Sequence, residues 1–407
     1  SLQAARILGR VKNEFGIEIA ARDLLNQGTI AGIADLLGER PEPSSNAASV
    51  SPPAPGQARG VLPRDAAERL VTQAWQAVSG DLSIGVCDKL EALTGRPRLA
   101  AALVQALGER LQRPVPALAE PTAECTLADV ANHVRPLLEE PVDGPVRVLQ
   151  QGGTQAPLFL IHPAGGSTAV YRTLVQRLGP DRPVYGLERL TEAPEVRDQA
   201  AEYARVIRAL HPSGPWFVGG WSFGGLVGQE AARLLAAHGT VSALILIDTV
   251  LPLPRPDLSR EQEAHNRFAA FAKYVEQVYG TPLRLPYDEL AVLDDAMQIE
   301  LVIKTLQQVV DLPPAIVEHQ RDSYLDLRSG ERHEPSPYPG RTLLYRATEL
   351  APHTVRDPRY ERDDERLGWE QFCPDLTVKR VPGHHLSLLD PPAVDVLGAL
   401  LAEDLQC

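Results

Sequence analysis

The 407-residue sequence lacks long apolar stretches, and this excludes several classes of protein. A membrane-spanning helix needs about 20 consecutive apolar residues, and no run here approaches that length. The N-terminus also lacks the basic-then-apolar pattern of a signal peptide. We therefore expect neither a membrane span nor secretion.

Cysteine and positive charge are also scarce. The four cysteines, Cys87, Cys125, Cys373 and Cys407, form no C-x-x-C pair. They suggest no zinc site and no disulfide framework, so we expect no metal and a reducing, cytoplasmic environment. Acidic residues outnumber basic ones by 53 to 40, which leaves a net charge of −13. Because phosphate binding relies on clustered Lys and Arg, we expect no nucleic-acid partner.

Two stretches poor in large apolar side chains divide the chain. Residues 40–61 are rich in Pro, Ser and Ala, which predicts a disordered linker. A shorter Pro/Gly/acidic stretch, LEEPVDGPV from Leu138, marks a second boundary. The predicted domains are therefore residues 1–39, 62–139 and 140–407.

The first two of these segments share one pattern. SLQAARILGRVKNEFGIEI carries apolar residues at helical spacing, and RLAAALVQALGERLQRPV repeats this pattern 96 positions later. With a shift of 97 positions instead of 96, TIAGIADLL from Thr29 aligns with TLADVANHV from Thr126. We interpret the segments as two copies of one small all-α helical bundle, the first of them cut short.

Both copies resemble the peptidyl and acyl carrier domains of nonribosomal peptide and polyketide synthases. In those carriers the pattern LGG-D/H-S-L opens the second helix, and its serine holds a 4′-phosphopantetheine arm. The resemblance implies that residues 1–39 are the C-terminal part of a carrier, with Ser1 as the attachment serine. A phosphopantetheinyl transferase would then be a partner. The alternative is a serine that only caps a helix.

The second copy departs from the carrier pattern where the arm should be attached. Residues 93–96, LTGR, stand in place of LGGD, and Pro97 stands in place of the serine. Proline has no hydroxyl to esterify, and Ser83 lies too early in the loop. We expect residues 62–139 to form a carrier-like domain without an arm, serving as a spacer or docking surface. An unrelated helical bundle is the alternative.

From Val146 onward, strand-like and helix-like segments alternate. The strand-like segments are APLFLIHPAGG, PVYGLE, PWFVGGWS, SALILID, RTLLYRA and LTVKRVPG. Helix-like segments such as EVRDQAAEYARVIRAL lie between them. This alternation predicts a doubly wound, mostly parallel sheet with helices on both faces.

One serine stands at a strand-to-helix junction in the pattern G-x-S-x-G, residues 220–224. A nucleophile elbow requires this context, because the serine sits in strained backbone and glycine neighbours let strand and helix approach. We predict that Ser222 is a nucleophile; a structural turn is the alternative. The orienting acid should follow in the chain, and Asp248 at the end of LILID is the candidate. Asp311 is a weaker rival.

Five motifs in order, HPAGG, GWSFGG, LILIDT, LGWEQF and VPGHHLSLL, resemble the terminal thioesterase domain of nonribosomal peptide and polyketide synthases. The resemblance covers Val146 to Cys407. It implies an α/β-hydrolase fold with a helical lid at about residues 253–338. The G-x-H pattern of that family aligns His385 with the general base and His384 with a variable position. His162 of HPAGG is interpreted as structural or close to the site, rather than as the base.

An ester or thioester reaction passes through an oxyanion, which needs amide donors aimed at it. The amide of Phe223, directly after the serine, is one expected donor. The loop HPAGG would supply the other, from Ala164 or, by a slip of one residue, from Gly165.

The resemblance implies a chain-releasing serine thioesterase. Ser222 would take an acyl or peptidyl group from a carrier-bound phosphopantetheine thioester and release it by hydrolysis or macrocyclisation. Upstream synthetase modules would supply that chain during secondary-metabolite biosynthesis. The alternatives are an editing thioesterase, a general carboxylesterase of the same fold, and a non-catalytic docking module.

Overall fold

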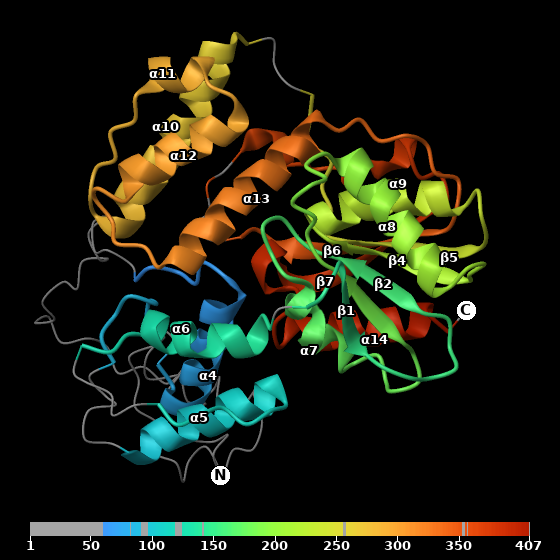
Figure 1. Cartoon of the computed structure of the whole chain (residues 1–407), viewed down its shortest axis with the longest axis horizontal. Helices are drawn as coiled ribbons and strands as arrows, with labels where there is room; N and C mark the ends of the chain where they lie inside the picture. The colour runs from blue at the N-terminus through green and yellow to red at the C-terminus, as the bar shows by residue number, and fades with distance from the viewer. Residues whose placement is uncertain are drawn as a thin grey trace, which may run out of the picture.

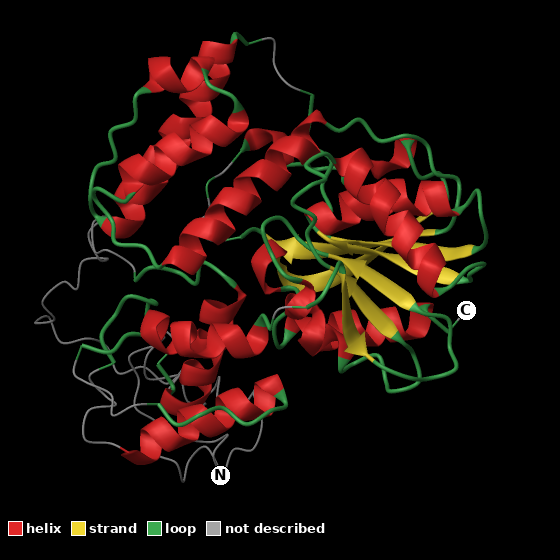
Figure 2. Cartoon of the chain, viewed as in Figure 1, coloured by secondary structure: helices red, strands yellow, loops and turns green. Residues whose placement is uncertain are grey.

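The computed structural model describes residues 60–81, 83–90, 97–118, 124–140, 142–254, 258–351, 355 and 357–406. These residues form a unit of helices, a sheet covered by helices on both faces, and a second group of helices beside the sheet (Figures 1 and 2). The predicted carrier segment 1–39, with Ser1, lies outside the described residues. So does all of the predicted linker except Gly60 and Val61.

Among the described residues, three helices form the N-terminal unit: α4 (Ala66–Ser79), α5 (Pro97–Leu111) and α6 (Leu127–Leu138). Their apolar faces share one core, in which Trp75 and Leu107 are buried. Val61 packs into the same core, so the packed unit already includes the last two residues of the predicted linker. The domain boundaries otherwise stay predictions.

Local sequence explains where these helices begin. The Asp65 side chain accepts the amide of Glu68 at the start of α4. Thr126 and Asp129 cap α6 reciprocally. Pro97 is the first residue of α5, a position where a missing N–H costs no helical hydrogen bond.

Seven strands form one sheet in the order β1-β3-β2-β4-β5-β6-β7. The strands are β1 (Val146–Gln150), β2 (Leu158–Ile161), β3 (Val184–Leu187), β4 (Trp216–Trp221), β5 (Val241–Ile247), β6 (Thr342–Glu349) and β7 (Leu376–His384). All neighbours are parallel except β1, which runs antiparallel to β3 at the edge. The expected α/β-hydrolase sheet is confirmed. β1 was not predicted, because a five-residue, partly exposed edge strand leaves little apolar pattern.

Alternate residues of β2 show how the sheet is covered. Phe159 and Ile161 pack with α8 (Val196–Leu210) and α9 (Phe223–Leu235). Leu158 and Leu160 face α7 (Arg172–Val175) and α14 (Ala393–Asp404) on the opposite side. Short 3-10 turns complete this part: Thr168–Tyr171, Pro358–Tyr360, Trp369–Gln371 and His385–Ser387.

Four helices lie between β5 and β6: α10 (Arg260–Tyr279), α11 (Tyr287–Val292), α12 (Asp295–Leu306) and α13 (Pro314–Arg332). They occupy the segment where the sequence predicts a lid. The segments EAHNRFAAFAKYVEQVYG (263–280) and AMQIELVIKTLQQVV (296–310) also predict helices there, and these coincide with α10 and α12. The sequence did not predict α13. Its buried residues include Asp326 and Ser329, and polar residues on a buried face weaken the apolar pattern of a helix.

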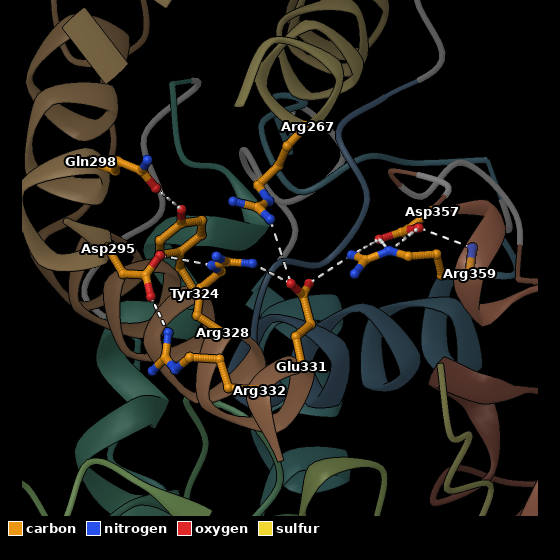
Figure 3. A network of polar contacts seen from close by, with 9 residues as sticks. All are labelled: Arg267, Asp295, Gln298, Tyr324, Arg328, Glu331, Arg332, Asp357 and Arg359. Atoms are coloured by element: carbon orange, nitrogen blue, oxygen red, sulfur yellow. Dashed lines mark hydrogen bonds and ion pairs between the residues drawn. The ribbon is translucent and has the colours of Figure 1, made fainter. Parts of the chain in front are cut away.

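A network of charged side chains holds these helices together (Figure 3). Arg328 of α13 donates to Asp295 of α12 at 2.7 Å and also to Glu331. Glu331 accepts from Arg359, in the loop between β6 and β7, at 3.0 Å. Arg267 of α10 donates to Glu331 at 3.5 Å. Three arginines from three segments therefore converge on one carboxylate.

Candidate active site

Ser222 stands between the end of β4 and the start of α9, in backbone that is unusual for a residue with a side chain. Its φ is 57° and its ψ is −121°, and its amide donates to the Ile247 carbonyl at 2.9 Å. A Cβ on Gly220 would lie 2.7 Å from the Ile161 carbonyl oxygen, and a Cβ on Gly224 would clash with the same oxygen. The glycines are therefore required by the close approach of β2, as expected of a nucleophile elbow.

The structure brings His385 and Asp248 together from two strands. Asp248 follows β5 and His385 follows β7, and the His385 Nδ1 lies 2.8 Å from the Asp248 Oδ2. A carboxylate can only accept, so Nδ1 carries a hydrogen, and in the neutral imidazole Nε2 then has the lone pair that a general base needs. The other Asp248 oxygen accepts the Ala347 amide of β6 at 2.8 Å. Asp311, the rival candidate, is exposed between α12 and α13.

His385, the predicted base, lies beside the predicted nucleophile elbow. The rings of His385 and Trp221, the residue before Ser222, have centroids 5.2 Å apart. Ser222 Oγ makes no hydrogen bond to another residue that the structure describes. Ser222 follows the carboxyl end of β4, Asp248 that of β5 and His385 that of β7. The three residues therefore lie along the same edge of the parallel sheet.

The proposed oxyanion donors differ in whether their amides are free. The Gly165 amide donates to the Asp326 side chain of α13 at 2.9 Å, so it is engaged. The amides of Ala164 and Phe223 donate no hydrogen bond to any described residue. Phe223 is the first residue of α9, where an amide has no acceptor inside the helix. This geometry favours Ala164 over Gly165.

Two further histidines near the site have other surroundings. His162 is fully buried, with Nε2 3.0 Å from the Gln199 side-chain oxygen and Nδ1 2.9 Å from the Pro163 carbonyl. A neutral imidazole can donate to only one of these two acceptor oxygens, and the structural role of His162 stays a prediction. Burial lowers the pKa of His384, and its Nδ1 has no hydrogen-bond partner among the described residues.

Thr249 and Trp369 support the site, although the sequence assigned them no role. The Thr249 hydroxyl donates to the Ser222 carbonyl at 3.1 Å, which links the acid loop to the elbow. The buried Trp369 indole donates to the Thr249 carbonyl at 2.7 Å. Trp369 belongs to the motif LGWEQF, but only its contact across 120 positions reveals what it does.

Over the described ranges, the residues hold no group of three or more His, Cys, Asp or Glu side chains arranged for a metal ion. Nor does any described helix have both the length and the apolar character needed to cross a bilayer.

Comparison with known families identifies the larger part of the chain. Residues 156–400 match the family model of the thioesterase domain. The chain belongs to the thioesterase domain family. This thioesterase domain contains the whole of the site described above, and the family predicted from the five motifs is confirmed. Residues 1–37 match a second model, the phosphopantetheine attachment site.

Curated relatives of this thioesterase domain include large synthases. The chain is 25% identical over 368 residues to a dimodular nonribosomal peptide synthase of Bacillus subtilis, covering 87% of this chain and 15% of the relative. It is 25% identical over 372 residues to chondramide synthase of Chondromyces crocatus, covering 85% of this chain and 9% of the relative. The chain thus spans less than a fifth of either relative's length.

Solved structures similar to this thioesterase domain include a four-domain nonribosomal peptide synthetase, AB3403. That match has 24% identity and a TM-score of 0.49, and covers 90% of this chain and 27% of the other. A second is the NocB thioesterase domain from the nocardicin cluster. It has 23% identity and a TM-score of 0.43, and covers 65% of this chain and all of the other.

Proposed function

We propose that the chain releases an acyl or peptidyl group from a carrier-bound phosphopantetheine thioester in nonribosomal peptide biosynthesis. One observation carries the proposal. A serine in strained backbone stands at the edge of the sheet, and the ring of the tryptophan before it packs against a histidine whose Nδ1 is held by a carboxylate. The sequence match to a phosphopantetheine attachment site in the same chain supports a carrier as the donor.

In the first step, Ser222 Oγ attacks the thioester carbonyl while His385 Nε2 takes its proton. Asp248 accepts a hydrogen bond from the His385 Nδ1–H and so stabilises the imidazolium that forms. The free amides of Phe223 and Ala164 would donate to the oxyanion. Collapse of the intermediate breaks the C–S bond, and His385 returns its proton to the departing thiol. The acyl group is then an oxyester of Ser222.

In the second step, His385 again acts as a general base. It deprotonates water, or an amine or hydroxyl of the same acyl chain, which attacks the oxyester. Water gives a free acid and an internal nucleophile gives a macrocycle. Ser222 recovers its proton from His385 as the product leaves.

We further propose that Ser1 carries the 4′-phosphopantetheine arm. The attachment-site match to residues 1–37 supports this, and the arm would supply the thioester. The carrier-like unit does not fit the arm, because Pro97 begins α5 where the serine would stand and has no hydroxyl. A phosphopantetheinyl transferase and upstream synthetase modules would then be partners. A cytoplasmic location, which the scarcity of cysteine favours, stays a prediction.

Intact-protein mass spectrometry with an acylated pantetheine thioester tests the proposal. The parent should gain one acyl group, and Ser222→Ala should gain none. His385→Ala should be acylated more slowly, by a factor on the order of 10³. Product release by Ser222→Ala at the parental rate would refute the assignment. For the arm, peptide mapping of the protein as its host makes it should find the modification at Ser1, and a modification between Leu62 and Leu137 would exclude this.

A further inference from the structure

Helix α13 lies directly against the loop that carries Ala164 and Gly165. Gly165 has a φ of 62°. A Cβ there would lie 2.6 Å from the His319 carbonyl oxygen of α13 and would also clash with the Ser323 amide nitrogen. Only glycine suits both this backbone conformation and this approach. The loop is thus shaped to receive α13.

Both backbone polar groups of Gly165 bond to side chains of α13. Its amide donates to Asp326 Oδ2 at 2.9 Å. Its carbonyl, which can only accept, lies 2.8 Å from His319 Nδ1, so this nitrogen is the donor. Gly165 directly follows Ala164, so these two bonds fix the backbone beside the Ala164 amide.

Asp326 is an unusual residue to find inside a protein. Its side chain is fully buried, and Arg189, which follows β3, donates to Oδ1 and Oδ2 at 3.0 and 3.1 Å. Such a buried ion pair is a weak source of stability, because desolvation offsets the attraction. The presence of the Asp326–Arg189 pair is therefore better explained by the geometry that Asp326 imposes on the Gly165 loop.

The other end of α13 reaches the second proposed donor. A Cβ on Gly330 would lie 3.4 Å from the Phe223 ring and 3.2 Å from Leu226 of α9. One helix therefore touches both the loop with the Ala164 amide and the residue that supplies the Phe223 amide.

We propose that Asp326, together with His319, is a positioning residue for acyl transfer: it fixes Gly165 and thereby aims the Ala164 amide at the oxyanion. Helix α13 is on this view a fixed part of the oxyanion hole, although it lies in the lid segment. The inference rests on the proposed role of Ser222.

Single-turnover acylation of Ser222 by an acylated pantetheine thioester tests it. In Asp326→Ala, the rate at saturating thioester should fall about 10- to 100-fold, the range expected when a catalytic donor is misplaced. The half-saturating concentration should change by less than about 3-fold, because ground-state binding is retained. Asp326→Asn keeps an acceptor for the Gly165 amide and should lose less.

Ser329→Ala is the matched control. Ser329 is also a buried polar residue of α13, but it accepts the Val196 amide at 3.0 Å and donates to Glu195, away from the Gly165 loop. This variant should lose thermal stability while its saturated rate stays within about 3-fold of the parent. An equal loss of rate in both variants would overturn the inference, and so would a parental rate in Asp326→Ala.

A second pair of variants decides the matter if Asp326→Ala does not fold. His319→Leu removes the donor to the Gly165 carbonyl and should slow saturated acylation about 10-fold or more, whereas His319→Gln should restore most of the rate. Parental rates in both variants would refute the positioning role. Failure of the parent itself to acylate Ser222 would instead refute the proposed function.

Discussion

At the scale of single residues, backbone strain coincides with the candidate site. Ser222 and Asp248 both have positive φ, 57° and 46°, although neither is glycine. Such conformations persist only where the surroundings determine them. Here the Ser222 amide bonds to Ile247, and the Asp248 amide donates to the Tyr345 carbonyl at 2.8 Å. The sheet therefore holds both side chains at its edge.

Asp248→Asn should separate charge from shape. Asparagine tolerates positive φ and can still accept the Ala347 amide, so the fold should be kept. It removes the negative charge opposite His385, so acylation should slow by a factor on the order of 10³ to 10⁴. The measurement is the rate of acyl loading on Ser222 by mass spectrometry, with thermal unfolding alongside.

Asp311→Asn is the control, because Asp311 is the exposed rival. It should load at the parental rate. If Asp248→Asn retained more than about a tenth of the rate, Asp248 would not be the orienting acid.

At the scale of elements, charge as well as apolar contact joins the helices of the lid segment. The apolar cluster includes Phe268 of α10, Ile303 of α12 and Ile316 of α13. Near the C-terminal end of α13 the contacts are instead ionic, centred on Glu331 (Figure 3). Side chains of Glu331 and Arg328 are only 8% and 11% exposed, so water screens this pair little.

Glu331→Gln should therefore destabilise the protein strongly. It leaves Arg267, Arg328 and Arg359 facing a neutral group. Breaking a buried ion pair in this way typically costs about 3–5 kcal/mol. The free energy of unfolding in urea measures the loss.

Glu300→Gln provides the comparison. Glu300 pairs with Arg321 at the surface, and the two side chains are 56% and 35% exposed. Exposed pairs contribute about 0.2–1 kcal/mol, so this variant should unfold almost as the parent does. Similar small losses in both variants would show that the Glu331 network does not stabilise the lid segment.

At the scale of the whole molecule, the helical unit is packed against the thioesterase domain. Val278 and Tyr279, at the end of α10, join the apolar core of that unit. The Arg69 Nε of α4 lies 4.0 Å from the Oδ2 of Asp390, which is five positions after His385. The helical unit thus contacts both the lid segment and the loop that follows His385.

A glutamate between the helical unit and the thioesterase domain should also make the stability of the folded protein depend on pH. At the end of α6, burial, with Asp65 and Glu188 nearby, raises the pKa of Glu139 to about 7. In the unfolded chain a glutamate has a pKa of about 4.3. Between these values the unfolded chain releases a proton that the folded protein keeps, so stability falls as pH rises through this window.

Glu139→Gln should remove this dependence. The variant should match the parent at about pH 4 and unfold at a higher temperature at about pH 8. Its control is Glu140→Gln, because Glu140 is exposed and pairs only at the surface with Arg113. An unfolding temperature at pH 8 no higher than the parent's would contradict the raised pKa of Glu139.

The sequence by itself determined the family, the alternation of strands and helices, and the candidates Ser222, Asp248 and His385. It also predicted helices in the segments of α5, α8, α10 and α12. Such inferences are possible because a glycine-flanked serine, a capped amphipathic helix or a short apolar strand is encoded by neighbouring residues.

Only the tertiary structure decided which groups meet. It paired His385 with Asp248 rather than Asp311, although 137 positions separate the pair. It engaged the Gly165 amide with Asp326, 161 positions away, and so left Ala164 as the free donor. It also revealed α13 and β1, whose patterns are weakened by a buried polar face and a partly exposed edge. Contacts between distant residues depend on how whole elements pack, and no local pattern records them.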